Sequence, residues 1–238
     1  MLLQFFSVLI ILGMGMYYSV RSKKMDVPGA YTGGLLGILI FLGVGYTGLA
    51  MLGFFFLAGS VVTAWKLNYK LSLSLAEENK GRRTASQALA NAGIAGILGL
   101  LSWLNPEKAY LFSIMLAASF AAATSDTFSS ELGNIYGRRY FNIITFKPDQ
   151  LGLNGVISLE GTLFGILGSA FISFIYGFGI AWGWEMLWII IAGIIGNLTD
   201  SVLGATLERQ TYLSNDAVNF LNTLVGALVA GLFYFLFG

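Results

Sequence analysis

Long apolar runs, separated by short polar segments, divide the chain into about eight stretches of membrane-spanning length. The second run is short, so a re-entrant hairpin is the alternative interpretation of that stretch. The pattern predicts an all-α fold, a polytopic transmembrane helix bundle. The expected helices are about Leu2 to Val20, Ala30 to Val44, Thr47 to Lys66, Ala85 to Leu104, Ala109 to Ser125, Val156 to Phe178, Glu185 to Thr206 and Ala217 to Phe237.

The basic residues favour this division, because with about eight spans nearly all of them fall on one side of the membrane. Only Lys108 falls on the opposite side. By the positive-inside rule, the basic side is cytoplasmic, which places both termini outside the cell membrane. Fusing the second and third spans would scatter the charges over both sides. The residues on the basic side are Arg21, Lys23, Lys24, Lys66, Lys70, Lys80, Arg82, Arg83, Arg138, Arg139, Lys147 and Arg209.

The connections on the basic side are the long ones, Leu67 to Thr84, Phe128 to Gly155 and Leu207 to Asp216. Within the first of them, Leu71 to Lys80 is too short to span a bilayer and predicts an interfacial helix or a lid. The long loops also lead us to expect that any ligand arriving from solution is bound on this side.

The composition limits which side-chain chemistry this protein can perform. The chain is 56% hydrophobic and 11% charged, which leaves too few charges for a soluble surface. It contains no Cys and no His, which excludes disulfides, zinc sites, thiol nucleophiles and a histidine base. Only oxygen ligands remain for a metal, and they select Mg²⁺, Mn²⁺ or Ca²⁺. The formal net charge of +1 gives no reason to expect a nucleic-acid partner.

Two similar acidic motifs close apolar runs. Asp126 lies in Ser125-Asp126-Thr127-Phe128, and Asp200 lies in Thr199-Asp200-Ser201-Val202, with the same hydroxyl, Asp, hydroxyl, apolar order. Carboxylates beside a membrane-spanning run are costly to bury and are functional by default. We therefore interpret the two motifs as one site built twice.

The motifs end two tandem units, Arg82 to Arg139 and Asn154 to Arg209. Each unit opens with a hydroxyl (Ser86 or Ser158) and places a polar side chain before a glycine-spaced helix, Asn91 in the first unit and Glu160 in the second. The last helix begins a third copy with Asn219 and Asn222. Because each unit holds two spans, the repeats are parallel and both Asp motifs are expected on the same side.

Acids and arginines together predict a site for a metal-bound polyphosphate, in which carboxylates hold the metal and guanidinium groups bind free phosphate oxygens. Interhelical ion pairs are the structural alternative. The acids near predicted helix ends are Asp126, Glu131, Glu160, Asp200 and Asp216, and the nearby arginines are Arg82, Arg83, Arg138, Arg139 and Arg209.

Asp126 and Glu131 lie five residues apart, about 140° around a continuous helix, so they share one face only if the helix breaks near Ser129-Ser130. We expect that break; otherwise Glu131 pairs with Arg138 or Arg139. Further along, Asn215 or Asp216 is expected to cap the last helix, with Ser214 as an alternative. Glycines inside the helices predict close packing, whereas Gly81 and Gly155 in loops are the candidates for a phosphate cradle.

Several segments resemble the family of integral membrane proteins that includes plant and cyanobacterial phytyl-phosphate kinase and the vertebrate transmembrane protein nineteen. The resemblance covers about two thirds of the chain, from Gly81 to the C-terminus. The segments that carry it are GRRTASQALAN, ATSDTFSSELG, GLNGVISLEGTLFGILG, GNLTDSVLGATLER and NDAVNFLNTLVGALVAG. We treat residues 1–238 as one integral membrane domain, with residues 1–66 a variable N-terminal part and residues 81–238 the motif-bearing catalytic region.

The resemblance implies a CTP-dependent, Mg²⁺-dependent kinase that converts an isoprenoid monophosphate, such as phytyl or geranylgeranyl phosphate, to the diphosphate at the cytoplasmic membrane face. A homodimer is left open. With the residues, it implies catalytic roles for Asp126, Asp200, Arg82 and Arg83. The expected metal ligands are Asp126, Glu131, Glu160 and Asp200. The expected substrate and nucleotide contacts are Arg82, Arg83, Ser86, Asn91, Arg209, Asn215, Asp216 and Asn219.

Other functions remain open from the sequence. A prenol kinase or a cytidylyltransferase-like enzyme would use similar residues. A transporter of an anionic phosphorylated solute would use the same arginines and acids, but it would place them at the membrane midplane. A lipid-binding scaffold without catalytic activity is a further alternative. The absence of histidine favours an acceptor that is already anionic, a monophosphate, over a free alcohol that benefits from a base.

Overall fold

The computed structural model describes residues 2–75 and 81–238, and in these residues the chain forms eight α-helices. The all-α expectation is therefore confirmed. The helices are α1 (Leu2–Arg21), α2 (Val27–Ala64), α3 (Leu67–Ser72), α4 (Ala85–Leu104), α5 (Ala109–Tyr136), α6 (Leu159–Gly179), α7 (Glu185–Leu203) and α8 (Asn215–Phe237). A 3₁₀ turn, η2 (Pro106–Lys108), precedes α5, and a π-helical turn, η3 (Gly204–Glu208), follows α7. Strand β1 (Phe141–Asn142) pairs antiparallel with β2 (Val156–Ile157).

Six helices in the described part of the chain are long and apolar enough to cross a membrane. They are α2, α4, α6, α8, and two that extend into their flanking turns, η2 with α5 and α7 with η3. α1 adds another helix of 20 residues. This is the arrangement of an integral membrane protein, as the hydropathy pattern predicts.

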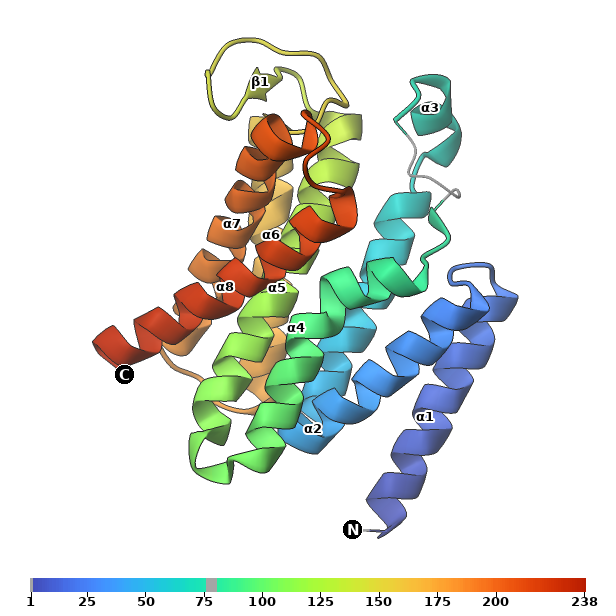
Figure 1. Ribbon diagram of the computed structural model, residues 1–238, viewed down its shortest axis with the longest axis vertical. Coiled ribbons are helices and arrows are strands. Elements are labelled where there is room, and N and C mark those ends of the chain that lie inside the picture. The colour runs from blue at the N-terminus through green and yellow to red at the C-terminus, as the bar shows by residue number, and fades with distance from the viewer. Residues whose placement is uncertain (1, 76–80) are drawn as a thin grey trace.

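Gly45 divides α2 into two legs, because its φ of 64° and ψ of −150° are not helical. A side-chain atom of Leu52 lies 3.4 Å from the place where a Cβ on Gly37 would stand. In a straight helix these two residues would lie about 22 Å apart. The legs therefore fold back on each other, as Figure 1 shows, and the predicted turn at Gly45-Tyr46 is confirmed.

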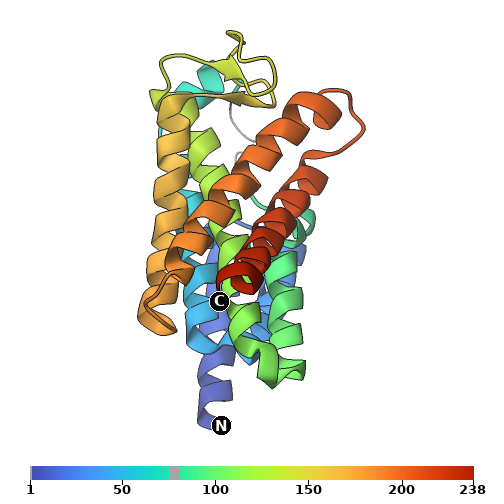
Figure 2. The ribbon, with the colours of Figure 1, turned by 90° about the vertical axis from the view of Figure 1, so that its left-hand side faces the viewer.

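The helix directions place the long connections at one end of the bundle, at the top of Figure 1, which we call the loop end. The connections α5–α6 and α7–α8 and the short helix α3 all lie there, whereas the N-terminus and the turns α4–α5 and α6–α7 lie toward the opposite end (Figures 1 and 2). The predicted grouping of long loops is thus found in the structure. The cytoplasmic identity of that end stays a prediction.

α5 is the central helix of the bundle and contacts α2, α4, α6, α7 and α8. Small side chains let its neighbours approach closely. A Cβ on Gly226 of α8 would lie 3.0 Å from the Ala118 carbonyl oxygen, and one on Gly168 of α6 would lie 2.9 Å from the Thr124 carbonyl oxygen. The glycine spacing therefore serves helix packing, as predicted.

Two local expectations are wrong. α5 continues without a break through Ser129-Ser130 to Tyr136. Hydroxyl groups fit inside this helix because they donate to carbonyls one turn earlier, Thr127 to Ala123 (3.0 Å) and Ser130 to Asp126 (2.9 Å). At the start of α8, the N-cap is Ser214, whose hydroxyl accepts from the Ala217 amide. Asn215 and Asp216 instead begin the helix itself.

Candidate functional site

A cavity of about 780 Å³ lies at the loop end, between the helices and the connections that follow them. Its walls come from α4, α5, α7, α8 and residues 151–158, with Ser74 and Leu75 from the segment after α3. Nine of the residues predicted from the sequence line it, among them both motif aspartates. These are Arg83, Ser86, Asn91, Asp126, Glu131, Asp200, Asn215, Asp216 and Asn219.

Asp126 on α5 and Asp200 on α7 meet in this cavity. Asp200 lies in the last turn of α7, whereas α5 continues beyond Asp126 to Tyr136. The two repeat units, α4–α5 and α6–α7, run in the same sequence of directions (Figure 1). The parallel arrangement thus brings the two copies of the acidic motif together. Glu208 of η3 also lines the cavity and acts on Asp200 through its charge.

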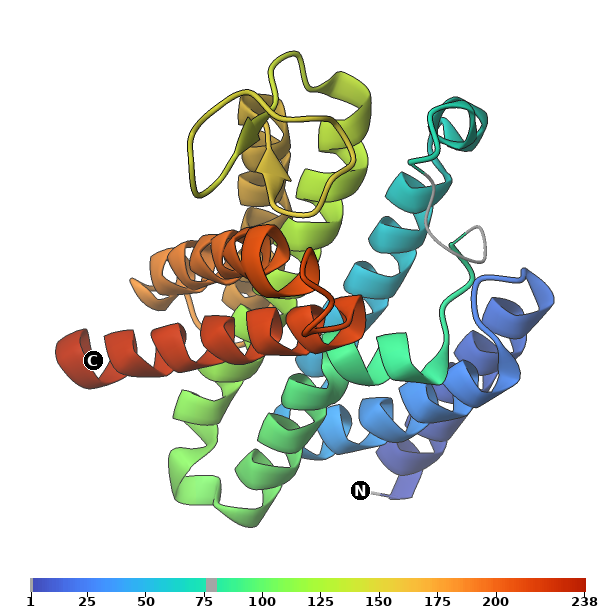
Figure 3. The same cartoon turned by 45° about the horizontal axis from the view of Figure 1, so that its top comes forward.

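The amino ends of three helices border the same cavity. Thr84, Ser158 and Ser214 are the N-caps of α4, α6 and α8, and each lines the cavity while its hydroxyl accepts from a backbone amide of its own helix. Figure 3 shows α8 beginning beside α4, and the two helices are in contact. Helix amino ends carry partial positive charge and unpaired N–H groups, so three of them together favour a polyanion.

The arginines are placed differently from one another. Arg83 lines the cavity, and its guanidinium lies 4.7 Å from the centre of the Phe55 ring. Its backbone is fixed by hydrogen bonds to Lys24 and Asp26. Arg82 is exposed, donates to the Met25 carbonyl (3.4 Å) and does not line the cavity. Of the predicted arginine contacts, Arg83 is therefore the one that the structure brings to the site.

Arg209 also lies off the cavity and holds the loop that covers it. Its guanidinium forms an ion pair with Asp149 (2.8 Å) and donates to the Asn154 carbonyl (2.6 Å). The Arg209 guanidinium, with the Gln150 amide and the Asn142 side chain, holds the pKa of Asp149 below its usual range. Arg209 thus positions the segment that contributes residues 151–158 to the cavity wall, including Gly155, one of the two predicted cradle glycines.

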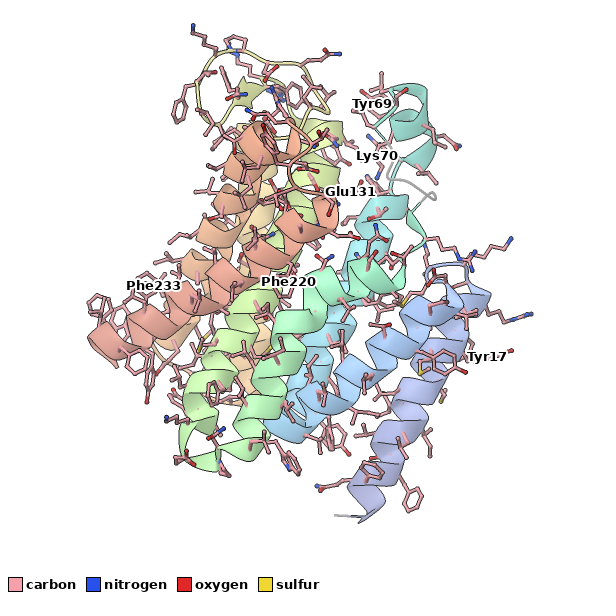
Figure 4. The ribbon with its side chains drawn as sticks, in the orientation of Figure 1. Tyr17, Tyr69, Lys70, Glu131, Phe220 and Phe233 are labelled. Atoms are coloured by element: carbon pink, nitrogen blue, oxygen red, sulfur yellow. The ribbon has the colours of Figure 1, made fainter. Side chains whose placement is uncertain are left out.

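Two predicted metal ligands are engaged elsewhere. Glu131 lines the cavity, but one carboxylate oxygen accepts from the buried ammonium of Lys70. Figure 4 shows both side chains between α3 and α5. Neither Arg138 nor Arg139 is the partner of Glu131 in these contacts, contrary to the alternative drawn from the sequence. Glu160 does not line the cavity, and it accepts from the Arg138 backbone amide at 3.3 Å.

Sequence reasoning missed several cavity residues. Glu208 precedes Arg209 directly, and Asn197 stands three residues before Asp200, so both lie close to motifs that were recognised. Nothing in the local sequence distinguishes either residue from other polar residues of the chain. Asn222 and Ser125 are buried beside the cavity and do not line it; the sequence marked Asn222 only as a buried polar residue in need of a partner, and Ser125 only as part of the motif. The predicted lid residue Lys80 lies outside the described residues.

The fold and the cavity define the class: an integral membrane protein with a polar cavity at one end that offers carboxylates and helix amino ends together. The sequence matches the family described as integral membrane protein DUF92 over residues 10–227, and the chain belongs to that family.

Relatives come from bacteria, plants and archaea. The chain is 32% identical over 216 residues to an uncharacterized membrane protein of Synechocystis sp., covering 89% of this chain and 84% of that protein. It is 32% identical over 213 residues to "Protein VTE6, chloroplastic" of Arabidopsis thaliana, covering 87% of this chain and 64% of that one. An uncharacterized membrane protein of Methanocaldococcus jannaschii is 33% identical over 231 residues, with coverage of 97% and 94%. No solved structure matches the chain.

Proposed function

We propose that this protein transfers a phosphoryl group from a nucleoside triphosphate to an isoprenoid monophosphate, in a reaction that depends on Mg²⁺. One observation carries the proposal: two carboxylates on facing helices and the amino ends of three helices border one cavity. Carboxylates suit the metal of a metal–nucleotide complex, and helix amino ends suit its phosphates. The cavity volume of about 780 Å³ is in the range of small-molecule sites.

The residues fit Mg²⁺ bound together with phosphate. Within the described residues, no group of three or more acidic side chains is placed to hold a metal on its own. Mg²⁺ commonly uses one or two protein carboxylates and takes its other ligands from water and substrate phosphates. Asp126 and Asp200 would supply the carboxylates. When bound, the ion would offset the negative charge of the phosphates.

The protein's own groups would bind and orient the two substrates. Arg83 and the amides at the starts of α4, α6 and α8 would contact phosphate oxygens. Asn91, Asn215 and Asn219 line the cavity beside them and offer amide groups for the rest of the nucleotide. Arg209, in this proposal, acts through the loop that it holds and not through substrate.

The acceptor is proposed to be a prenyl monophosphate. An oxygen of the acceptor phosphate attacks the γ-phosphorus, the bond to the β-phosphate oxygen breaks, and the nucleoside diphosphate leaves with that electron pair. The product is the prenyl diphosphate. A phosphate acceptor needs no base to remove a proton at neutral pH, and the chain contains no histidine to serve as one. The prenyl tail would lie in the bilayer between helices.

CTP as donor and the phytyl or geranylgeranyl chain as acceptor rest on the family resemblance described above. Membership in a family with a chloroplast relative is consistent with that resemblance. A prenol kinase or a cytidylyltransferase would use the same cavity, and only the products distinguish the three reactions. A transporter is less well supported, because the cavity that contains the carboxylate pair is walled in part by connections at one end of the bundle, residues 151–158 with Ser74 and Leu75.

The test uses the full-length protein, purified in detergent, with Mg²⁺, each nucleoside triphosphate and geranylgeranyl phosphate. Formation of prenyl diphosphate and nucleoside diphosphate is expected, fastest with CTP. Asp126→Asn and Asp200→Asn should each abolish product, since the amide keeps the shape but loses the charge. Glu107→Gln, a carboxylate change at the opposite end, is the matched control and should keep full activity. Normal turnover in both Asp variants would contradict the proposal.

A second measurement compares geranylgeraniol with its monophosphate. Faster turnover of the alcohol would make the protein a prenol kinase. Release of pyrophosphate with formation of a CDP-lipid would make it a cytidylyltransferase. Our proposal expects neither.

A further inference from the structure

Near the carboxylate pair lie two fully buried polar side chains. Ser125 on α5 and Asn222 on α8 are both 0% exposed. Among the residues that the structure describes, the Ser125 hydroxyl has no hydrogen-bond partner, and the Asn222 amide has none at bonding distance, although it lies beside the Asp200 carboxylate and interacts with it. An unsatisfied buried polar group costs roughly 1–3 kcal/mol, so groups of this kind beside a carboxylate pair call for a reason.

These side chains adjoin the two aspartates. Ser125 directly precedes Asp126 in α5, and the carboxylate of Asp200 lies against Asn222. On α7, Gly196 and Asp200 share a face because they are four residues apart. The Asn222 amide oxygen packs on that same face, 2.8 Å from where a Cβ on Gly196 would stand. Asn222 therefore reaches about one helical turn deeper than the cavity wall at Asp200.

Two glycines make space for these polar side chains, because they have no side chain of their own. A Cβ on Gly196 would collide with the Asn222 oxygen, as described above. A Cβ on Gly165 of α6 would stand 2.8 Å from the Ser125 hydroxyl oxygen and 3.0 Å from the Asn197 amide nitrogen. Any larger residue at either position would push the polar groups away. The space that these glycines leave to the Ser125 and Asn222 side chains, beside the cavity and not part of its lining, is called the polar recess below.

We propose that this recess is the inner part of the cation site, and that the Asn222 amide oxygen and the Ser125 hydroxyl are metal ligands alongside Asp126 and Asp200. This inference rests on the proposed function and deepens it. Carboxylate, amide and hydroxyl oxygens are ligands that a hard divalent cation accepts, and the two carboxylates match its charge. Because α5, α7 and α8 supply all four groups, the site exists before a nucleotide arrives.

The test measures the metal alone, by titrating the full-length protein with Mn²⁺ without nucleotide and reading the free ion by electron paramagnetic resonance. Mg²⁺ should compete for the site. Asn222→Leu is expected to weaken binding by about tenfold or more, and Ser125→Ala to weaken it less. Thr223→Val is the matched control, a neighbouring buried residue whose hydroxyl donates to the Phe220 carbonyl at 2.8 Å. It should bind Mn²⁺ like the unmodified protein.

Thermal unfolding tests whether a variant that binds Mn²⁺ more weakly is still folded. Without metal, Asn222→Leu should melt at or above the temperature of the unmodified protein, because it removes unsatisfied polar atoms. Added Mn²⁺ should raise the melting temperature of the unmodified protein but not that of this variant.

The outcomes separate the two proposals. Unchanged Mn²⁺ affinity in Asn222→Leu and Ser125→Ala, with binding lost in Asp126→Asn and Asp200→Asn, overturns this inference and leaves the proposed function intact. If the unmodified protein binds Mn²⁺ only with nucleotide present, the preformed site is overturned in the same way. If the Asp variants also bind Mn²⁺ normally, the metal site of the proposed function fails as well.

Discussion

Lys70 of α3 and Glu131 of α5 form a buried ion pair that ties a short helix at the loop end to the central helix of the bundle (Figure 4). The Lys70 ammonium also donates to the carbonyls of Thr63 (2.6 Å) and Val62 (3.3 Å), near the end of α2. One basic side chain thus neutralises a carboxylate of the cavity wall and satisfies two carbonyls at a helix terminus. The segment that follows α3 supplies Ser74 and Leu75 to the same cavity.

Breaking this pair from one side should destabilise the protein more than removing it altogether. Lys70→Met leaves a buried carboxylate without its partner and is expected to cost about 3–5 kcal/mol. The double variant Lys70→Met with Glu131→Leu should recover most of that loss, because no buried charge remains. Thermal unfolding in detergent measures all variants. Additive losses in the double variant would show that the two side chains do not act as a pair.

The ion pair between Arg209 and Asp149 should make the loop over the cavity sensitive to acid. The folded-state pKa of Asp149 is lowered, so its contribution to loop stability is present above the unfolded pKa, about 3.9, and is lost as pH falls through the folded pKa. A fluorophore attached to Thr145→Cys should report a loosened loop below about pH 4. Asp149→Asn should show the loosened signal already at neutral pH. An identical acid transition in that variant would assign it to another group.

Close contact between α2 and α4 should make Gly99 intolerant of substitution. A Cβ there would lie 2.5 Å from the Leu39 carbonyl oxygen and 2.8 Å from the Ile40 Cα, and backbone atoms cannot move aside alone. Gly99→Ala is expected to lower stability by about 1–3 kcal/mol. Gly53→Ala is the control, since nothing lies within 4 Å of its Cβ position and alanine favours the helix. Equal melting temperatures for both variants would contradict the packing described here.

The orientation predicted from the basic residues can be tested because the chain contains no cysteine. Single cysteines at Ser74, Asn142 and Gly183 place two labels at the loop end and one at the opposite end. In intact cells, an impermeant thiol reagent should label only Gly183→Cys. The other two should react after the membrane is opened. Labelling of Ser74→Cys or Asn142→Cys in intact cells would reverse the orientation.

The sequence by itself determined the helical elements and their order. Bilayer thickness sets the length of an apolar run, so hydropathy predicted the bounds of α4 as the structure has them. The repeated Asp motif, with the same number of spans in each unit, was enough to predict that the motifs of Asp126 and Asp200 lie on the same side. Both inferences depend on periodicity along the chain, which a single sequence displays directly.

Only the tertiary structure decided which polar groups meet. Lys70 and Glu131 are 61 residues apart, and Arg209 and Asp149 are 60 apart, so their pairing depends on how helices cross and loops fold back. For the same reason Glu160 and Arg209, both predicted at the site, lie off the cavity wall, while Glu208 lines it. The polar recess beside Asp200 depends on Gly165 and Gly196 facing Ser125 and Asn222 from other helices. Such contacts follow from packing in three dimensions, which leaves no regular pattern in the sequence.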